Sequence, residues 1–152
     1  MTIRAATPVD IPFMMSLERT CPTAAHWSEQ QYGQLFQASG SGSQRLVFVI
    51  RADDGETPLG FLVARRVVSD WEVENIVVAL DVRRRGCGQR LLHALLAHAS
   101  ETRCDSVFLE VRQSNSAARA LYQRAGFRET GRRKSYYTHP QEDAVLYSWT
   151  PH

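Results

Sequence analysis

The chain has 152 residues, 43% of them hydrophobic and 22% charged, and a formal net charge of +2 at pH 7. These values are typical of one compact globular domain, expected over residues 1–152, and they exclude the disordered and fibrous classes. The three cysteines are scattered, the N-terminal stretch has no basic-then-apolar leader, and no apolar run has membrane length, so we expect a cytoplasmic protein without a membrane partner. The nearly neutral chain does not demand a nucleic-acid partner and none is expected, although clustered arginines leave local basic patches possible.

The N-terminal part predicts one strand and two helices. The stretch TIRAAT has the composition of a short strand. Thr7 with Asp10 three residues later is a capping-box pattern, which predicts a first helix through Leu17. Ser28 and Gln31 repeat the pattern and predict a second short helix.

The next part predicts a three-stranded meander followed by a helix. RLVFVIR and PLGFLVARRV are apolar, β-branched runs separated by ADDGET, whose Asp54-Gly55 pair signals a hairpin turn. WEVENIVVAL is the third strand. After Gly86, an apolar stripe at helical spacing faces a core and comprises Leu91, Leu92, Leu95, Leu96 and Ala99.

The remaining segments complete an α/β or α+β fold. SVFLEVR reads as a strand, and the preceding helix makes this a βαβ crossover, so the strands near Val77 and Leu109 should be parallel. SAARALYQRAG predicts another helix that Gly126 ends. GFRETGRR and EDAVLYSW predict two antiparallel strands. We therefore expect a mixed central β-sheet flanked by helices on both faces.

The turn VRRRGCGQ lies between a predicted strand and a predicted helix. Its unpaired backbone amides and the positive end of the helix dipole suit an anionic ligand such as a diphosphate. It is neither a P-loop nor a dinucleotide-binding G-x-G-x-x-G motif. By itself, the glycine pair is equally compatible with a purely structural turn.

Four motifs in order, NIVV, RRRGCGQRLL, LEVRQSNSAARALYQRAGF and YYTHPQEDAVLY, resemble the GCN5-related N-acetyltransferase (GNAT) superfamily. Within it they are most similar to the ribosomal-protein-alanine N-acetyltransferase (RimI) family. The resemblance, from about Leu59 onward, implies acetyl-CoA as co-substrate and no metal. It also implies transfer to a protein N-terminus, that of small-subunit ribosomal protein 18, by a monomer or weak dimer. A small-molecule amine or lysine acceptor and a non-catalytic acetyl-CoA-binding module are the alternatives.

The resemblance places the coenzyme on the glycine turn and on the strand before it. In the family the turn cradles the diphosphate, and the strand pairs with the pantetheine arm, with the Val78 amide facing the thioester oxygen. Asn115 matches a family asparagine that touches the coenzyme, although by position alone it is more often only a helix cap. The expected coenzyme-binding residues are Ile76, Val77, Val78, Arg83, Arg84, Arg85, Gly86, Cys87, Gly88, Gln89 and Asn115.

Acyl transfer to an amine needs one group to accept a proton and another to donate one. Glu110 and Arg112 lie on the same face of their predicted strand. A carboxylate in a strand covered on both faces is costly to bury unless it is paired with an arginine or has a catalytic role. Glu110 matches the family's general base. Tyr122 lies on an apolar helical stripe typical of a core aromatic, and the resemblance makes it the general acid. Glu74, on the preceding strand, is the rival base.

The acceptor cleft is expected to be lined by Trp27, Glu74, Tyr136 and Tyr137. Family members commonly carry Phe-Pro before Trp-Ser, whereas this chain has AAHWSEQQY, so the family pattern does not carry over to this wall. Cys87 stands at a helix start, where thiols become reactive, but we expect no covalent role for it. The histidines lack metal-ligand spacing.

Overall fold

The computed structural model describes residues 1–21, 24–36, 44–82 and 85–151. Two short 3-10 helices, Pro8–Asp10 and Leu80–Val82, accompany the main elements. These are β1 (Thr2–Ala5), α1 (Ile11–Arg19), α2 (Glu29–Gln34), β2 (Arg45–Arg51), β3 (Pro58–Val67), β4 (Asp70–Val78), α3 (Cys87–Glu101), β5 (Val107–Arg112), α4 (Ser116–Arg124), β6 (Arg128–Tyr137) and β7 (Glu142–Trp149).

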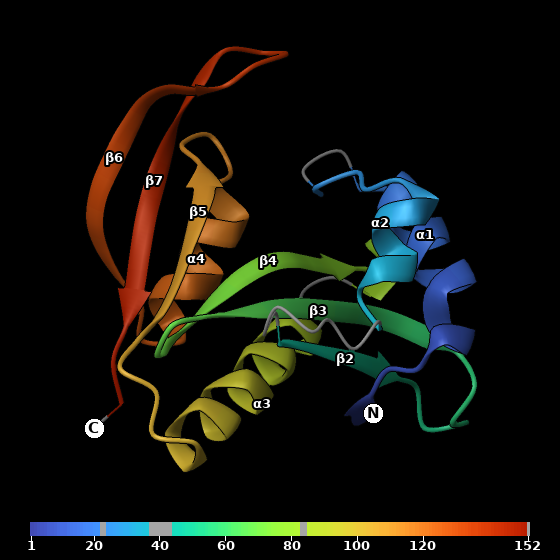
Figure 1. Cartoon of the computed structure of the whole chain (residues 1–152). Coiled ribbons are helices and arrows are strands. Elements are labelled where there is room, and N and C mark those ends of the chain that lie inside the picture. The colour runs from blue at the N-terminus through green and yellow to red at the C-terminus, as the bar shows by residue number, and fades with distance from the viewer. Residues whose placement is uncertain (22–23, 37–43, 83–84, 152) are drawn as a thin grey trace.

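The strands form one seven-stranded sheet in the order β1-β2-β3-β4-β5-β7-β6 (Figure 1). Every neighbouring pair is antiparallel except β4 and β5, which are parallel. The sheet is therefore mixed, and the predicted crossover through α3 is confirmed. None of the described helices is long and apolar enough to span a membrane.

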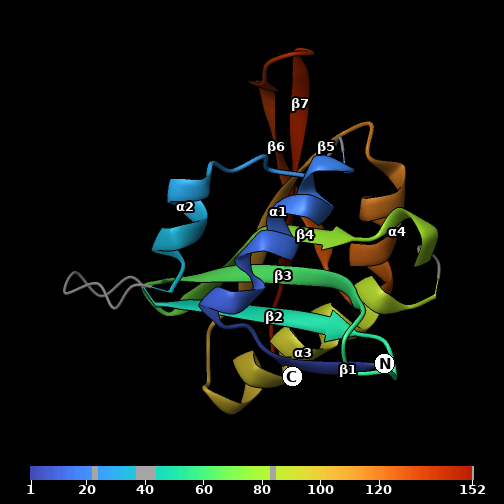
Figure 2. The same ribbon diagram turned by 90° about the vertical axis from the view of Figure 1, so that its right-hand side faces the viewer.

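Helices cover the two faces of the sheet, as predicted. In Figure 1 and Figure 2, α1 and α2 lie on one face and α3 lies on the other. The predicted stripe of α3 is buried in the larger core together with Val107, Leu109 and Val111 of β5 and with Tyr122 of α4. The smaller core joins α1 and α2 to β2, β3 and β4. Two separate cores thus hold the sheet from opposite sides.

The two parallel strands separate soon after they meet. Among the described residues, β4 and β5 pair only at Trp71 with Val107 and Glu72 with Phe108. Beyond that point the strands diverge like the arms of a V (Figure 1). On this side, no described strand pairs with the second half of β4, and its backbone groups need another hydrogen-bond partner.

A β-bulge interrupts β4 just where the strands separate. Ala64 of β3 pairs with Val73, but the next pair is Val63 with Asn75, which leaves Glu74 as the extra residue. Trp71 and Val73 belong to the core beneath α3, whereas Val77 belongs to the core beneath α1 and α2. An extra residue exchanges the two faces of a strand, because side chains alternate with period two. Here that turns Ile76 and Val78 toward the α3 side.

The predicted helix starts are present with small changes. The Ser28 amide donates to Gln31 Oε1 at 2.8 Å, and the Gln31 amide donates to Ser28 Oγ at 3.2 Å, so this capping box is confirmed. The Thr7 amide donates to Asp10 Oδ2 at 2.8 Å. The first helix begins as a 3-10 turn and continues past the predicted end at Leu17 to Arg19.

Candidate active site

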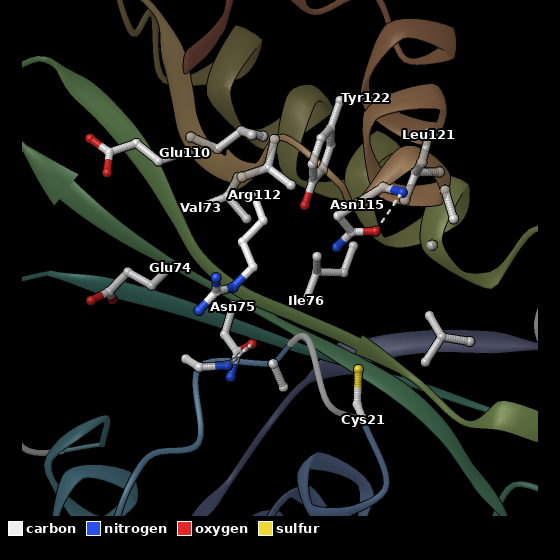
Figure 3. Close-up of a pocket in the computed structure, with 18 of the residues that line it drawn as sticks. Cys21, Val73, Glu74, Asn75, Ile76, Glu110, Arg112, Asn115, Leu121 and Tyr122 are labelled. Carbon is white, nitrogen blue, oxygen red and sulfur yellow. Dashed lines mark hydrogen bonds between the residues drawn. The ribbon is translucent and has the colours of Figure 1, made fainter. Parts of the chain in front are cut away.

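Two neighbouring cavities occupy the space opened by the diverging strands. Figure 3 shows residues that line the larger one. The larger, about 1280 Å³, is lined by β4, β5, the start of α3, one side of α4 and the segment before α2. The smaller, about 240 Å³, lies beside it. The residues that line both cavities, and so mark their junction, are Val73, Glu74, Glu110 and Tyr137.

The start of α3 forms one end of the large cavity through Gly86, Cys87, Gly88 and Gln89. Gly86 precedes the helix with φ of +83°, a conformation that glycine adopts without strain. A Cβ on Gly88 would lie 3.0 Å from Leu121 Cδ2, so this glycine lets α4 approach α3 closely. Gln89 Oε1 is buried without a hydrogen-bond partner in the described part of the chain.

The arginines and the cysteine of the predicted turn differ in their exposure to solvent. Arg85 is exposed. Arg83 and Arg84 lie outside the described residues. The Cys87 side chain is 2% exposed, and burial raises the pKa of its thiol, the opposite of what an activated nucleophile requires.

Strand β4 contributes alternate side chains to the large cavity. Ile76 and Val78 line it. Val77 is 1% exposed and packs into the opposite core, so only its backbone can face a ligand in this space. This arrangement is compatible with an extended ligand lying along the unpaired edge of β4, because such a ligand would satisfy backbone groups as an added strand does.

Asn115 caps a helix and also faces the large cavity. Its Oδ1 accepts a hydrogen bond from the Ala118 amide at 3.2 Å, which caps α4 (Figure 3). It also lines the large cavity. The helix-cap interpretation is therefore correct, and it leaves the residue available to a ligand.

Glu110 lies at the junction of the cavities, with its side chain 19% exposed. Strand β5 lies in the interior of the sheet, but the expectation that both of its faces are covered is wrong: the Glu110 face opens onto the cavities. The carboxylate forms an ion pair with Arg133 Nε at 3.2 Å. Its charge and hydrogen bond raise the pKa of Tyr136.

Tyr122 combines a core position with access to the cavity. It is 5% exposed, and its ring lies 5.9 Å from that of Phe127 and 6.2 Å from that of Tyr147. Its phenol oxygen points into the large cavity (Figure 3). Burial raises the pKa of Tyr122, and Tyr137 raises it further, so the phenol stays protonated at neutral pH.

The four residues expected in the acceptor cleft come together, because Trp27, Glu74, Tyr136 and Tyr137 all line the small cavity. Glu74 is ion-paired with Arg45 at 2.9 Å. Burial, together with the Glu110 charge, raises the pKa of Tyr137 to about 12.

The segment before Trp27 adopts a conformation that proline cannot. His26 has φ of +57°, whereas the proline ring holds φ near −65°. A proline at this position, as in the family pattern, would require another backbone path. The Trp27 amide donates to Glu18 Oε1 at 2.9 Å, and its ring packs edge-on against Tyr32.

Sequence reasoning missed several cavity residues. Glu72 lines the small cavity, while Cys21, Asn75 and His139 line the large one. No local pattern marks them, since their position depends on the bulge and on contacts between distant segments. Within the described residues, no group of three or more His, Cys, Asp and Glu side chains could hold a metal.

Comparison with known proteins identifies the fold. Residues 11–127 match the model of the acetyltransferase (GNAT) family. The chain belongs to this family. It is 33% identical over 147 residues to the [ribosomal protein bS18]-alanine N-acetyltransferase of Escherichia coli K12, with 95% of this chain and 94% of the relative covered.

Solved structures agree with this assignment. The crystal structure of the ribosomal-protein-S18-alanine N-acetyltransferase from Escherichia coli aligns with a TM-score of 0.79 at 28% identity, covering 98% of this chain and 92% of that one. The crystal structure of Arabidopsis thaliana NAA60 in complex with acetyl-CoA aligns with a TM-score of 0.84 at 19% identity, covering 99% of each chain. At this identity the likeness shows a shared fold only. The resemblance stated from the motifs is confirmed, and the protein is an acetyltransferase.

Proposed function

We propose that this acetyltransferase transfers the acetyl group of acetyl-CoA to the N-terminal α-amine of a protein, with the N-terminal alanine of ribosomal protein bS18 as acceptor. The observation that carries the proposal is the pair of cavities that meet at Glu110 and Tyr137. One is large enough for a coenzyme, and the other is a small, partly aromatic space suited to a chain end. The bS18-acetylating relatives support the choice of acceptor.

The residues of the large cavity fit acetyl-CoA. Amides at the start of α3 suit the diphosphate, and Gly86 has open space beside it for close approach of the ligand. The unpaired edge of β4 beside Ile76 and Val78 suits the pantetheine arm, and the Val78 amide would stabilise the thioester oxygen as negative charge develops. Bound there, the coenzyme supplies an activated acetyl group.

Glu110 and Tyr122 then divide the proton transfers. The acceptor enters as an ammonium with a pKa of about 7.7 to 8.0. Glu110 accepts its proton, and the amine nitrogen attacks the thioester carbonyl carbon. The carbon–sulfur bond breaks, and the protonated Tyr122 phenol donates its proton to the departing thiolate. The nitrogen releases its second proton, which returns to the Tyr122 phenolate, and Glu110 passes the first proton to solvent. This direct transfer requires no acyl-enzyme, and burial, which raises the pKa of the Cys87 thiol, gives that residue no covalent role in it.

The test uses purified protein, acetyl-CoA and a peptide copying the N-terminus of the organism's own bS18. We expect fragment mass spectrometry to place the acetyl group on the α-amine. Glu110→Gln should lower kcat by about 10²- to 10⁴-fold, the usual contribution of a general base. Glu129→Gln, at an exposed strand position, is the matched control and should keep full activity.

Two other results would change the proposal. Near-normal turnover in Glu110→Gln with loss in Glu74→Gln would make Glu74 the base. An unmodified peptide alongside tightly bound acetyl-CoA would rule out the peptide acceptor and leave the small-amine and non-catalytic alternatives.

A further inference from the structure

Tyr137 occupies the junction of the two cavities, at a strand pair that an irregular stretch of β6 separates from the rest of the ladder. Arg133 of β6 pairs with Ala144, and the next described pair is Tyr137 with Glu142. Three residues of β6 thus face a single residue of β7, so the ladder is interrupted immediately before Tyr137. An irregular hairpin end keeps one geometry only where other contacts support it.

Arg112 supplies such contacts from the neighbouring strand β5. Its Nη2 donates to the Thr138 carbonyl at 3.2 Å, and its Nη1 donates to the Pro140 carbonyl at 3.0 Å. Nη1 also lies 3.3 Å from Glu142 Oε2. The guanidinium carbon lies 4.4 Å from the centre of the Tyr137 ring.

This contact set uses the particular chemistry of arginine. A planar guanidinium can stack on an aromatic ring while its edge donates several hydrogen bonds in fixed directions, whereas the lysine ammonium is a point charge on a flexible stem. Arg112 also belongs to the strand that carries Glu110, two residues away on the same face. The same strand thus carries the Glu110 carboxylate and the group that holds Tyr137.

We propose that Arg112 is a positioning residue for the acceptor. By holding Tyr137 and residues 138–142, it shapes the junction where the acceptor amine enters, and it contributes little to coenzyme affinity. This inference rests on the proposed function. Because Arg112 also lines the large cavity, direct contact with the coenzyme is the competing role that the experiment must separate.

The first measurement compares Arg112→Lys with wild type. We expect kcat/KM for the acceptor peptide to fall about 10- to 100-fold, mainly because KM rises. A loss of this size is typical when a group that positions the substrate is displaced. The Kd for acetyl-CoA, measured by calorimetry, should not change. The matched control is Arg132→Lys, because Arg132 pairs with Glu129 on the exposed strand and lines neither cavity. A raised Kd for acetyl-CoA in Arg112→Lys would overturn the proposal.

A double variant tests whether Arg112 acts through Tyr137. If it does, Arg112→Lys combined with Tyr137→Leu should lose no more activity than Tyr137→Leu alone, within about twofold. If the fold-loss of the double variant equals the product of the two single losses, Arg112 acts independently of Tyr137. That result would also overturn the proposal.

A third measurement does not depend on the acceptor. Amide hydrogen exchange over residues 136–142 should be faster in Arg112→Lys than in wild type and unchanged in Arg132→Lys. Unchanged exchange in Arg112→Lys would contradict the positioning role. If wild type does not acetylate the peptide but exchange responds as expected, the proposed acceptor fails while the role of Arg112 in holding this turn stands.

Discussion

At the scale of single residues, the two groups assigned to proton transfer occupy contrasting surroundings. Glu110 is partly exposed and paired with Arg133, so it has both a charge partner and access to solvent. Tyr122 is enclosed by aromatic rings, and burial raises the pKa of its phenol. A partly solvated carboxylate and a buried phenol suit the opposite tasks of accepting and donating a proton.

The role of Tyr122 can be tested with minimal disturbance of packing. Tyr122→Phe removes only the hydroxyl, so it should lower kcat by about 10²-fold or more while leaving the Kd for acetyl-CoA nearly unchanged. Tyr147→Phe is the matched control, since its hydroxyl bonds Arg119 and Gln123 and lines neither cavity. Steady-state kinetics measure both variants. Equal rates for the two would remove Tyr122 from the mechanism.

Some of the candidate site residues could be predicted from the sequence, and others could not. Glu110, Tyr122 and the glycines of the turn could be proposed from the sequence because motif spacing is local, and all of them line the large cavity. Position alone favours a cap for Asn115 and the motif favours a coenzyme contact; the side chain caps α4 and also lines the large cavity, so the two are compatible. The opening of the Glu110 face was missed, since what covers a strand depends on segments distant in the chain.

At the scale of elements, Asp10 joins β1, the first 3-10 turn and β2. It is fully buried and accepts hydrogen bonds from Arg4 at 2.8 Å, Arg51 at 2.8 Å and the Thr7 amide. Burial alone would raise the pKa of this carboxyl, but these partners outweigh it and the net shift is downward. The Asp10 carboxylate thus links β1, the first 3-10 turn and β2.

This shift has a defined pH dependence. Because the folded-state pKa lies below the ordinary value of 3.8, the contribution of Asp10 is present above about pH 4 and is lost as the pH falls through the folded-state pKa. Asp10→Asn should lower the free energy of unfolding at pH 7 by about 1–3 kcal/mol. Urea unfolding from pH 7 to pH 3 should show a smaller loss in this variant than in wild type. A parallel decline, with the same gap at every pH, would contradict the linkage.

At the scale of the whole molecule, the sheet opens between β4 and β5. In the part of the chain that the structure describes, a two-pair parallel ladder is all that joins these strands. Gly88 of α3 lacks a side chain where Leu121 of α4 approaches it, which lets the two helices lie close together. A ligand bound in the V contacts both sides. It should therefore stabilise the folded protein as well as supply the acetyl group.

That stabilisation can be measured without catalysis. At 100 times its Kd, coenzyme A should add about 2.7 kcal/mol, which for a chain of this size corresponds to a rise in Tm of roughly 5–10 °C. Glu110→Gln should show the same rise. Gly86→Val should show a smaller one, because valine is strained at φ of +83° and the turn must change. An unchanged rise in Gly86→Val would place the coenzyme elsewhere.

The sequence by itself determined the succession of strands and helices along the chain, the crossover through α3, the glycine turn and the family. Periodicity, caps and motifs are properties of neighbouring residues. Only the tertiary structure decided the bulge at Glu74, the separation of β4 from β5 and the way Arg112 holds Tyr137. Trp27, Glu110 and Tyr137 are far apart in the chain and share one cavity. Their meeting depends on strand order and register, which arise from packing between distant segments rather than from any local pattern.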